Sequence, residues 1–263
     1  MLKWNVIYEE DSFFNALTSS SSVVATAQMG ISNLFFNKDA QREAFEQGDR
    51  PARVALADYA ARVMTDILLP EKQRQEPFLM EVLYNKQQHL QYGPTRRTYS
   101  PLVPFIFERT DVWCRENILH VSFRVTKNAK TNASEEDKVR ENIVHHFLSN
   151  LYHQISTSKA MVHIACNVLQ DNIRNVIKQK AAIAFIANGS ILPRKSGASQ
   201  QPMSSPPAIP FQAPNNSGTM TPTTILIPMG ALQAYLPSSS AISISLSKDG
   251  LVSITGLMIP EGK

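Results

Sequence analysis

The stretch "PFIFERTDVWCRENILHVSFRVTK", residues 104–127, decides the fold class of this chain. It carries β-branched and aromatic residues on both sides of the polar "REN". After "REN", the β-branched and aromatic faces of the expected strand come from Ile118, Val121, Phe123 and Val125. Such runs, broken by a short polar turn, are typical of paired strands. The stretch therefore predicts two strands joined at "REN".

Helical patterns flank these strands on both sides. "RVALADYAARVMTDILL", residues 53–69, has apolar residues near helical spacing, and Pro70 predicts its end. Downstream, Ser134 and Asp137 resemble a capping box, and apolar residues then step by four from Val139 to Ile155. We therefore expect an α+β chain.

Weaker patterns give further expectations. A short helix is expected before Gly48, and a turn at "KDG", residues 248–250. Helix is also expected over residues 76–85 and 169–180. Strands are expected at "AMVHIACNV" (160–168), the buried "AAIAFIA" (181–187), "TTILIPMG" (223–230), "AISISLS" (241–247) and "LVSITGLMI" (251–259).

These patterns divide the chain into four parts. Residues 1–50 are small and polar in places and are expected to be divergent and loosely ordered. Residues 51–197 form a mixed α+β domain, and residues 198–223 form a connection rich in Pro, Ser, Gln and Asn that cannot fold alone. Residues 224–263 are the start of a β-rich unit whose open sheet edges predict aggregation of the isolated chain.

The composition is that of a globular chain of 263 residues, with 43% hydrophobic and 18% charged residues. A net charge of +4 tolerates a nucleic-acid partner without predicting one. No apolar run is long enough for a membrane span, and the acidic beginning lacks the character of a signal or transit peptide. We expect a soluble chain of the cytoplasm or the mitochondrial matrix, with Cys114 and Cys166 reduced.

Enzyme motifs with a defined spacing are absent from the sequence. No GxSxG, HExxH or kinase signature occurs, and "GLMIPEGK", residues 256–263, only approaches a phosphate loop, with five residues between its glycines instead of four. His146 and His153 are about 10 Å apart along a helix, which is too far for one tetrahedral metal. No catalytic residue and no metal ligand is therefore predicted.

Two basic segments are candidates for binding. "ILPRKSG" ends with Arg194, Lys195, Ser196 and Gly197, whose cations, hydroxyl and backbone amides are groups that recognise phosphate. The alternative is a hairpin that turns at Asn188 and Gly189, or an ordinary solvent-exposed strand exit. A second candidate is "PTRRTY".

In "PTRRTY", Arg96, Arg97 and Tyr99 combine two cations with an aromatic ring. Phosphate contact together with base stacking would suit single-stranded RNA. The alternative is a solvated basic turn.

The segment "AIAFIANGSILPRKSG-ASQQPM" resembles the "VAFVADGAILPRxSGxSxxPM" segment of the predicted ATPases of the ABC class. That family is distinct from ABC transporters and includes a kinetoplastid mitochondrial RNA-editing factor. "RVALADYAARV", "FERTDVWCRENILHVSFRV", "IPFQAP" and "VSITGLMIPEGK" resemble further family segments in the same order, so the resemblance covers about residues 51–263. Asn188 stands where the family usually has Asp. Family members continue from "IPxG" into a phosphate loop, whereas this sequence ends at Lys263.

The resemblance implies the N-terminal domain and the first β-strands of an ABC-type ATPase core. The complete protein would bind and hydrolyse ATP with Mg²⁺, and would couple this to RNA or ribonucleoprotein handling. Without Walker A or Walker B, this chain alone would bind no cofactor and would not be catalytic. Its partner would be an ATPase core or the missing C-terminal part. The alternative is a truncated, non-catalytic paralogue that acts as an RNA- or protein-binding scaffold.

Overall fold

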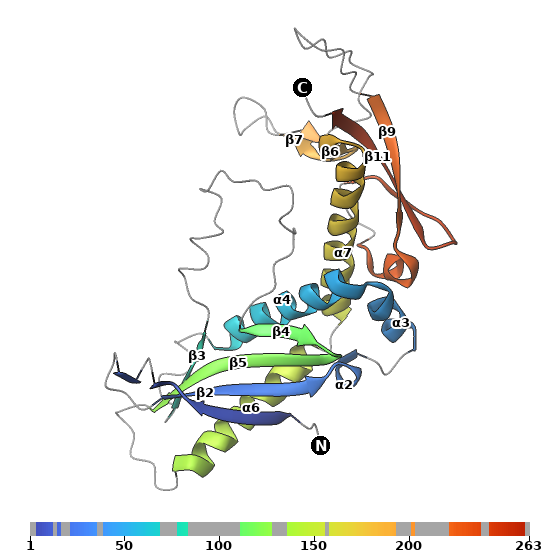
Figure 1. Ribbon diagram of the computed structural model, residues 1–263. Helices are drawn as coiled ribbons and strands as arrows, with labels where there is room; N and C mark the ends of the chain where they lie inside the picture. Colours follow the sequence, from blue (N-terminus) through green and yellow to red (C-terminus); the bar gives the residue numbers. More distant parts are fainter. Residues whose placement is uncertain are drawn as a thin grey trace. The chain divides into compact units, whose positions relative to one another are not determined.

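A computed structural model describes eleven stretches of the chain (Figure 1). They are residues 4–12, 15–16, 22–35, 39–68, 78–83, 111–127, 136–155, 158–192, 201–202, 221–237 and 242–260. Helices and antiparallel sheets are both abundant, which confirms the α+β class.

The contacts between residues divide the chain into two compact units. Unit 1 comprises Met1–Arg42 and Arg53–His163, and unit 2 comprises Glu43–Ala52 and Ile164–Lys263. Such units need not fold separately, so the domain boundaries at residues 50, 197 and 223 stay predictions.

Unit 1 contains a five-stranded antiparallel sheet, called sheet A. Its strands are β1 (Asn5–Glu10), β2 (Ser22–Gly30), β3 (Phe78–Val82), β4 (Val112–Arg115) and β5 (Ile118–Lys127). β2 lies along one edge of β5, β3 and β4 lie along the other, and β1 pairs with β2. The predicted strands around "REN" are confirmed as β4 and β5. Their turn residues Glu116 and Asn117 have φ values of 49° and 60°, as a type I′ turn requires.

One face of sheet A forms the core of unit 1. Leu119, Val121, Phe123 and Val125 of β5 are buried on this face. Figure 1 shows α6 (Glu136–Ile155) crossing behind the sheet, and the rings of Phe123 and Phe147 meet edge to face with centroids 4.8 Å apart. The predicted capping-box helix is confirmed as α6, although its Ser134 lies outside the described residues.

The predicted helix over residues 53–69 is confirmed as α4 (Asp49–Ile67). It begins four residues earlier because Pro51 is compatible with the first turn of a helix. Its buried side chains are mostly small, and Ala55, Ala60 and Ala61 are fully buried.

The sequence predicts a loosely ordered segment over residues 1–50, and the structure corrects this. The segment contains β1, β2, α2 (Ser32–Phe35) and α3 (Asp39–Gln47), which is the short helix expected before Gly48. In β2, Ala25 and Ala27 are fully buried. Small residues give a weak local strand signal, and the order of β2 comes from pairing with β5, about a hundred residues away.

Two other expectations about secondary structure are wrong. Residues 78–82 form β3 instead of helix, because this segment pairs with β5 from Phe78↔Lys127 to Val82↔Phe123. Residues 160–168 belong to α7 (Ser158–Gln179) instead of a strand. The residues buried there are Ala160, Met161, Ile164, Ala165, Val168 and Leu169, and this spacing is helical.

Unit 2 contains a four-stranded antiparallel sheet, called sheet B. Its strands are β6 (Ala182–Ala187), β9 (Thr221–Pro228), β10 (Ile244–Leu246) and β11 (Leu251–Pro260), which confirms the strands expected there. β9 lies along one edge of β11, and β6 and β10 follow one another along the other. The expected burial of β6 is wrong, because Ile183 is 65% exposed and only Ala187 is buried.

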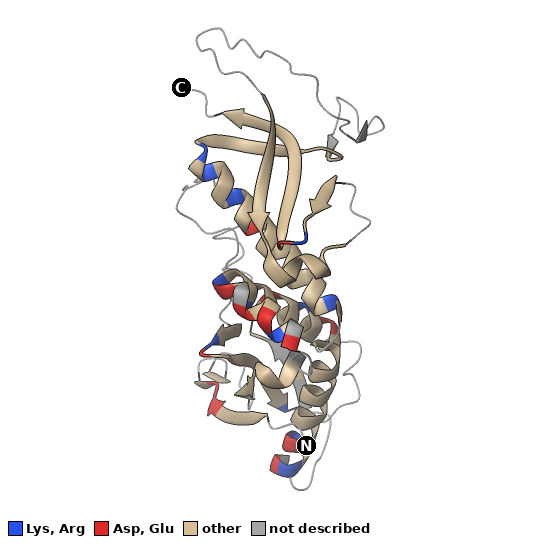
Figure 2. Ribbon diagram, turned by 90° about the vertical axis from the view of Figure 1, so that its right-hand side faces the viewer, with Lys and Arg blue, Asp and Glu red and all other residues tan. Residues whose placement is uncertain are grey.

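The inner face of sheet B is apolar. Ile225, Ile227, Val252 and Ile254 are buried, and Asn172 of α7 donates a hydrogen bond to Met229 Sδ at 3.9 Å. None of the four strands contains a charged residue, and Figure 2 shows them in tan throughout. The stretch "GLMIPEGK" begins inside β11, so its described part, Gly256–Pro260, is strand and not a phosphate loop.

The expected turn at "KDG" joins β10 to β11. Gly250 has a φ of 73°, and its carbonyl accepts the N–H groups of both Met229 and Gly230 at 2.9 Å. A Cβ atom on Gly250 would lie 2.8 Å from Gly230 Cα. Glycine at position 250 therefore ties the start of the 3₁₀ helix η3 (Gly230–Tyr235) to sheet B.

Candidate functional site

The basic segment that ends in Gly197 follows β6 through a tight turn. The Ser190 N–H donates to the Ala187 carbonyl at 3.0 Å, and Gly189 has a φ of 87°. The φ of Asn188 is not positive. Gly189 is the third residue of the turn from Ala187 to Ser190. A turn in which only the third residue has a positive φ is typically of type II, and glycine is favoured at that position.

Backbone hydrogen bonds fasten this turn to sheet B and its neighbours. The Asn188 N–H donates to the Thr255 carbonyl at 2.8 Å, and the Asn188 carbonyl accepts the Ser243 N–H at 3.0 Å. The side-chain Oδ1 of Asn188 is buried, and no described residue donates a hydrogen bond to it. Buried oxygens in proteins are normally paired, so we expect a water or a group outside the described residues to contact it.

Beyond the turn the chain enters a two-stranded ribbon formed by β7 (Ile191–Leu192) and β8 (Gln201–Pro202). Ile191 pairs with Pro202, and Leu192 pairs with Gln201. β6 pairs with β11 and not with β7, so the hairpin alternative for "IANGSIL" is wrong.

Residues 193–200 therefore connect the two paired ends of the β7–β8 ribbon. Arg194, Lys195, Ser196 and Gly197 all fall in this connection and lie outside the described residues. Their contact with phosphate stays a prediction.

This segment has part of the spacing of a phosphate loop. Residues 189–196 read "GSILPRKS", which places a glycine, a lysine and a serine as in GxxxxGK[ST], with Arg194 in place of the second glycine. A phosphate loop wraps backbone N–H groups around the anion, but Ile191 and Leu192 are extended and paired in β7. The described half of the segment therefore does not have the form of a phosphate loop.

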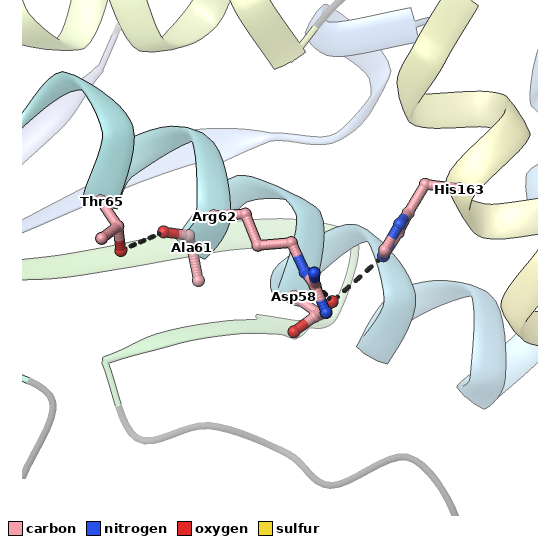
Figure 3. Close-up of polar contacts among 5 residues, drawn as sticks. All are labelled: Asp58, Ala61, Arg62, Thr65 and His163. Carbon is pink, nitrogen blue, oxygen red and sulfur yellow. Dashed lines mark hydrogen bonds and ion pairs between the residues drawn. The ribbon is translucent and has the colours of Figure 1, made fainter. Parts of the chain in front are cut away.

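Unit 1 contains a polar cluster on α4 and α7, shown in Figure 3. Oδ2 of Asp58 lies 2.7 Å from Nε of Arg62 and 3.1 Å from Nε2 of His163. The ring of Tyr59 is tilted against that of His163, with centroids 5.4 Å apart. Asp58 and Arg62 are four residues apart, a spacing that could have been read from the sequence. The sequence gives no such signal for His163, because residues 160–168 have a pattern that fits a strand.

The charge of Asp58 is stabilised by its partners. Burial by itself would raise the pKa of Asp58, but the hydrogen bonds from His163 and Arg62 outweigh burial and lower the pKa below its ordinary value. A carboxylate held in this way is a good hydrogen-bond acceptor and a poor proton donor at neutral pH. The cluster links α4 to α7 through the two hydrogen bonds that Asp58 accepts.

The candidate RNA contacts Arg96, Arg97 and Tyr99 lie outside the described residues, so RNA contact there stays a prediction. In the described part of the same unit, the rings of Trp113 and His120 stack at 4.8 Å with an angle of 6°. Burial and then the positive charge of Arg115 lower the pKa of His120. A neutral imidazole against an indole suits a stabilising cross-strand pair.

Other chemical candidates give no site in the described part of the chain. No group of three or more His, Cys, Asp or Glu side chains that could hold a metal ion occurs there. Cys114 and Cys166 are free thiols, and burial, opposed by Arg53, raises the pKa of Cys114 to about 12. Among the described helices, none has the length and apolar character of a membrane span.

Comparison with protein families gives a match over part of the chain. The model of the P-loop domain of the ABC_ATPase family matches residues 156–230. These residues include α7, the turn at Asn188, the β7–β8 ribbon and β9. The match supports a relationship to an ABC-class ATPase-like P-loop family.

No curated protein and no solved structure matches the chain.

Proposed function

We propose that this chain supplies part of the nucleotide-binding apparatus of an ABC-class ATPase. The observation that carries the proposal is the family match over residues 156–230, which contains the whole path from α7 to β9. The match covers the basic segment at Arg194 and Lys195, where the side chains are of the types that recognise phosphate.

The charge of the surrounding sequence supports an anionic ligand. Between Asn172 and Ser247 the sequence contains five Lys or Arg residues and no Asp or Glu. A region with charges of one sign raises the local concentration of oppositely charged ligands. Triphosphate is such a ligand, and we propose that Arg194 and Lys195 contact its phosphate groups.

The resemblance implies that this chain alone binds no cofactor; from the charge of the segment we propose instead that it binds the phosphate groups of ATP, and that it does not hydrolyse ATP alone. Hydrolysis needs a loop that wraps the β- and γ-phosphates together with Mg²⁺, and the sequence contains no GxxxxGK[ST]. The 263-residue chain would then contribute cations to a nucleotide site whose phosphate loop comes from elsewhere. We propose in addition that the complete protein couples ATP hydrolysis to RNA handling.

The test is equilibrium binding of a fluorescent ATP analogue to the 263-residue chain, with and without Mg²⁺. We expect saturable binding that ATP competes away, and an affinity lowered about tenfold or more in the Arg194→Ala, Lys195→Ala variant, because two charge-assisted contacts are lost. The matched control is Lys178→Ala, Lys180→Ala, which removes two exposed charges at the end of α7 and should bind as the wild type does.

Failure to bind ATP analogue would count against the proposal and favour the non-catalytic scaffold. Equal losses in both double variants would show a general charge effect instead of a site. Magnesium-dependent turnover by the wild-type chain would contradict the claim that it does not hydrolyse ATP alone.

A further inference from the structure

The strand β9 forms an edge of sheet B. Among the strands that the structure describes, it pairs only with β11. Pro222, Thr224, Leu226 and Pro228 are all exposed, and Leu226 is 59% exposed. An exposed edge strand presents unpaired backbone groups to which another strand can bind.

The register identifies which backbone groups of β9 point away from β11. The Met229 N–H donates to the Gly250 carbonyl at 2.9 Å, just beyond the pair Pro228↔Leu251. Hydrogen-bonded positions alternate along an antiparallel pair, so the odd-numbered residues of β9 face β11 and the even-numbered ones face outward. The two prolines agree with this, because a proline has no N–H to give to the ladder.

The outward edge therefore has a limited set of donors. Its even-numbered residues are Pro222, Thr224, Leu226 and Pro228. Both prolines lack an N–H, so the donors within β9 are the N–H groups of Thr224 and Leu226. These two donors are symmetric about Ile225, and so are the two prolines.

From this symmetry we propose that β9 pairs with β9 of a second copy of the chain, antiparallel and around a two-fold axis at Ile225. In this register the Thr224 N–H donates to the Leu226 carbonyl of the second copy, and the Leu226 N–H donates to its Thr224 carbonyl. The axis repeats both bonds, so all four available N–H groups are paired. The prolines of the two copies lie opposite one another, where no donor is left unpaired.

Side chains and charge favour a second copy over an unrelated strand. β9 contains no charged residue, whereas exposed edges are commonly protected by charges, especially lysine, or by proline. The two prolines of β9 lie on either side of Thr224 and Leu226, so the two donors between them stay available for pairing. In the proposed register the two exposed Leu226 side chains are diagonal neighbours on one face, within reach of each other. The contact is short, so a weak monomer–dimer equilibrium is expected instead of a permanent dimer.

The test is sedimentation velocity of the full chain over a wide range of protein concentration. We expect the wild type to dimerise reversibly. Thr224→Pro removes two of the four intermolecular hydrogen bonds and should raise the dimer Kd about 30-fold. Leu226→Lys places two like charges near the axis and should also yield monomers. Because Leu226 is exposed, this variant keeps the test valid if Thr224→Pro does not fold.

The matched control is Ser245→Lys, an exposed position on β10 in the same cross-strand row as Leu226, away from the β9 edge. It should dimerise as the wild type does. Hydrogen exchange should slow at the Thr224 and Leu226 amides as the dimer forms. A wild type that stays monomeric, or a dimer that both β9 variants leave intact, overturns the proposal, as does assembly that grows beyond the dimer through this edge.

Discussion

Sheet A and sheet B differ in the charge of their strands and in the apolar side chains that they expose to solvent. Sheet A carries charged residues on four of its strands, and Arg124 on β5 is paired with Asp11 at 2.7 Å. Sheet B carries none. Of the five large apolar side chains exposed in the described residues, only Ile7 belongs to unit 1, whereas Ile183, Leu226, Ile242 and Leu246 belong to unit 2.

This difference suggests that the two sheets meet different surroundings in the functional protein. Charges on exposed strands are compatible with water and discourage pairing with other chains. A sheet without charges and with exposed Leu and Ile is compatible with a partner surface. We therefore expect mutations to act on sheet A through folding stability and on the outside of sheet B mainly through association.

The largest effect on stability is expected for Phe123→Ala in sheet A. The side chain is fully buried and contacts Phe147. Its loss leaves a cavity and should lower the free energy of unfolding by about 3–5 kcal/mol. Urea unfolding gives the total loss, and hydrogen exchange should show it in the peptides of β2 and β5. Equal loss of protection in β9 and β11 would show that the two sheets do not respond separately.

A smaller effect is expected for Gly256→Ala in sheet B. A Cβ atom there would collide with the Ile186 carbonyl oxygen and lie 2.8 Å from Ala187 Cα, so β6 and β11 must move apart. Overpacking of this kind costs about 1–3 kcal/mol. Hydrogen exchange should now rise in β6 and β11 while sheet A keeps its protection. Unchanged exchange in β6 would contradict the predicted close approach.

Asp58→Asn should destabilise unit 1 by about 1 kcal/mol at neutral pH, because the charge-assisted hydrogen bonds from Arg62 and His163 are weakened. The folded-state pKa of Asp58 is lowered from 3.8. The Asp58 carboxylate therefore contributes its full stabilisation of the folded state above pH 3.8. The wild type loses this stabilisation as the pH falls through the lower, folded-state pKa of Asp58.

Urea unfolding of the wild type and of Asp58→Asn, from neutral pH to below the folded-state pKa of Asp58, would measure the difference between their free energies of unfolding. Asp137→Asn is the control, because the Asp137 side chain is 84% exposed in its pair with Arg140 and such pairs contribute little. A difference between wild type and Asp58→Asn that persists unchanged at the acid end would argue against the carboxylate as its source.

The smallest effect on stability is expected for Leu226→Lys, the variant that should abolish dimerisation. Exposed substitutions usually change stability by no more than about 0.5 kcal/mol. Thermal unfolding at a concentration where the chain is monomeric should therefore give nearly the wild-type midpoint. A large loss would place Leu226 in the core of sheet B and remove the contrast between the sheets.

The sequence predicted the elements whose pattern is local. The turn between β4 and β5 was found from alternation around "REN", and α4 and α6 were found from helical spacing. β2 and β3 were missed because each depends on pairing with the distant β5. In α7, Met161 and Ile164 were assigned to a strand because a short apolar run does not distinguish the two structures.

The candidate site was predictable only in its chemistry. The residue types of Arg194 and Lys195 indicated an anion, but the path of the chain toward them was not readable from "IANGSIL". That path depends on the type II turn at Gly189 and on the pairing of β7 with β8 instead of β6. Strand pairing is decided by the contacts between separate segments, and a single sequence carries little information about such contacts.

The pairing of β2 with β5 also has a consequence for the order of folding. It joins residues 22–30 to residues 118–126, whereas β9, β10 and β11 pair within a span of residues 221–260. Contacts between residues that are distant in sequence form more slowly than local ones. During synthesis, the β1–β2 hairpin must wait for β5 with Ala25, Ala27 and Met29 unprotected, so the beginning of this chain is where a chaperone would be needed most.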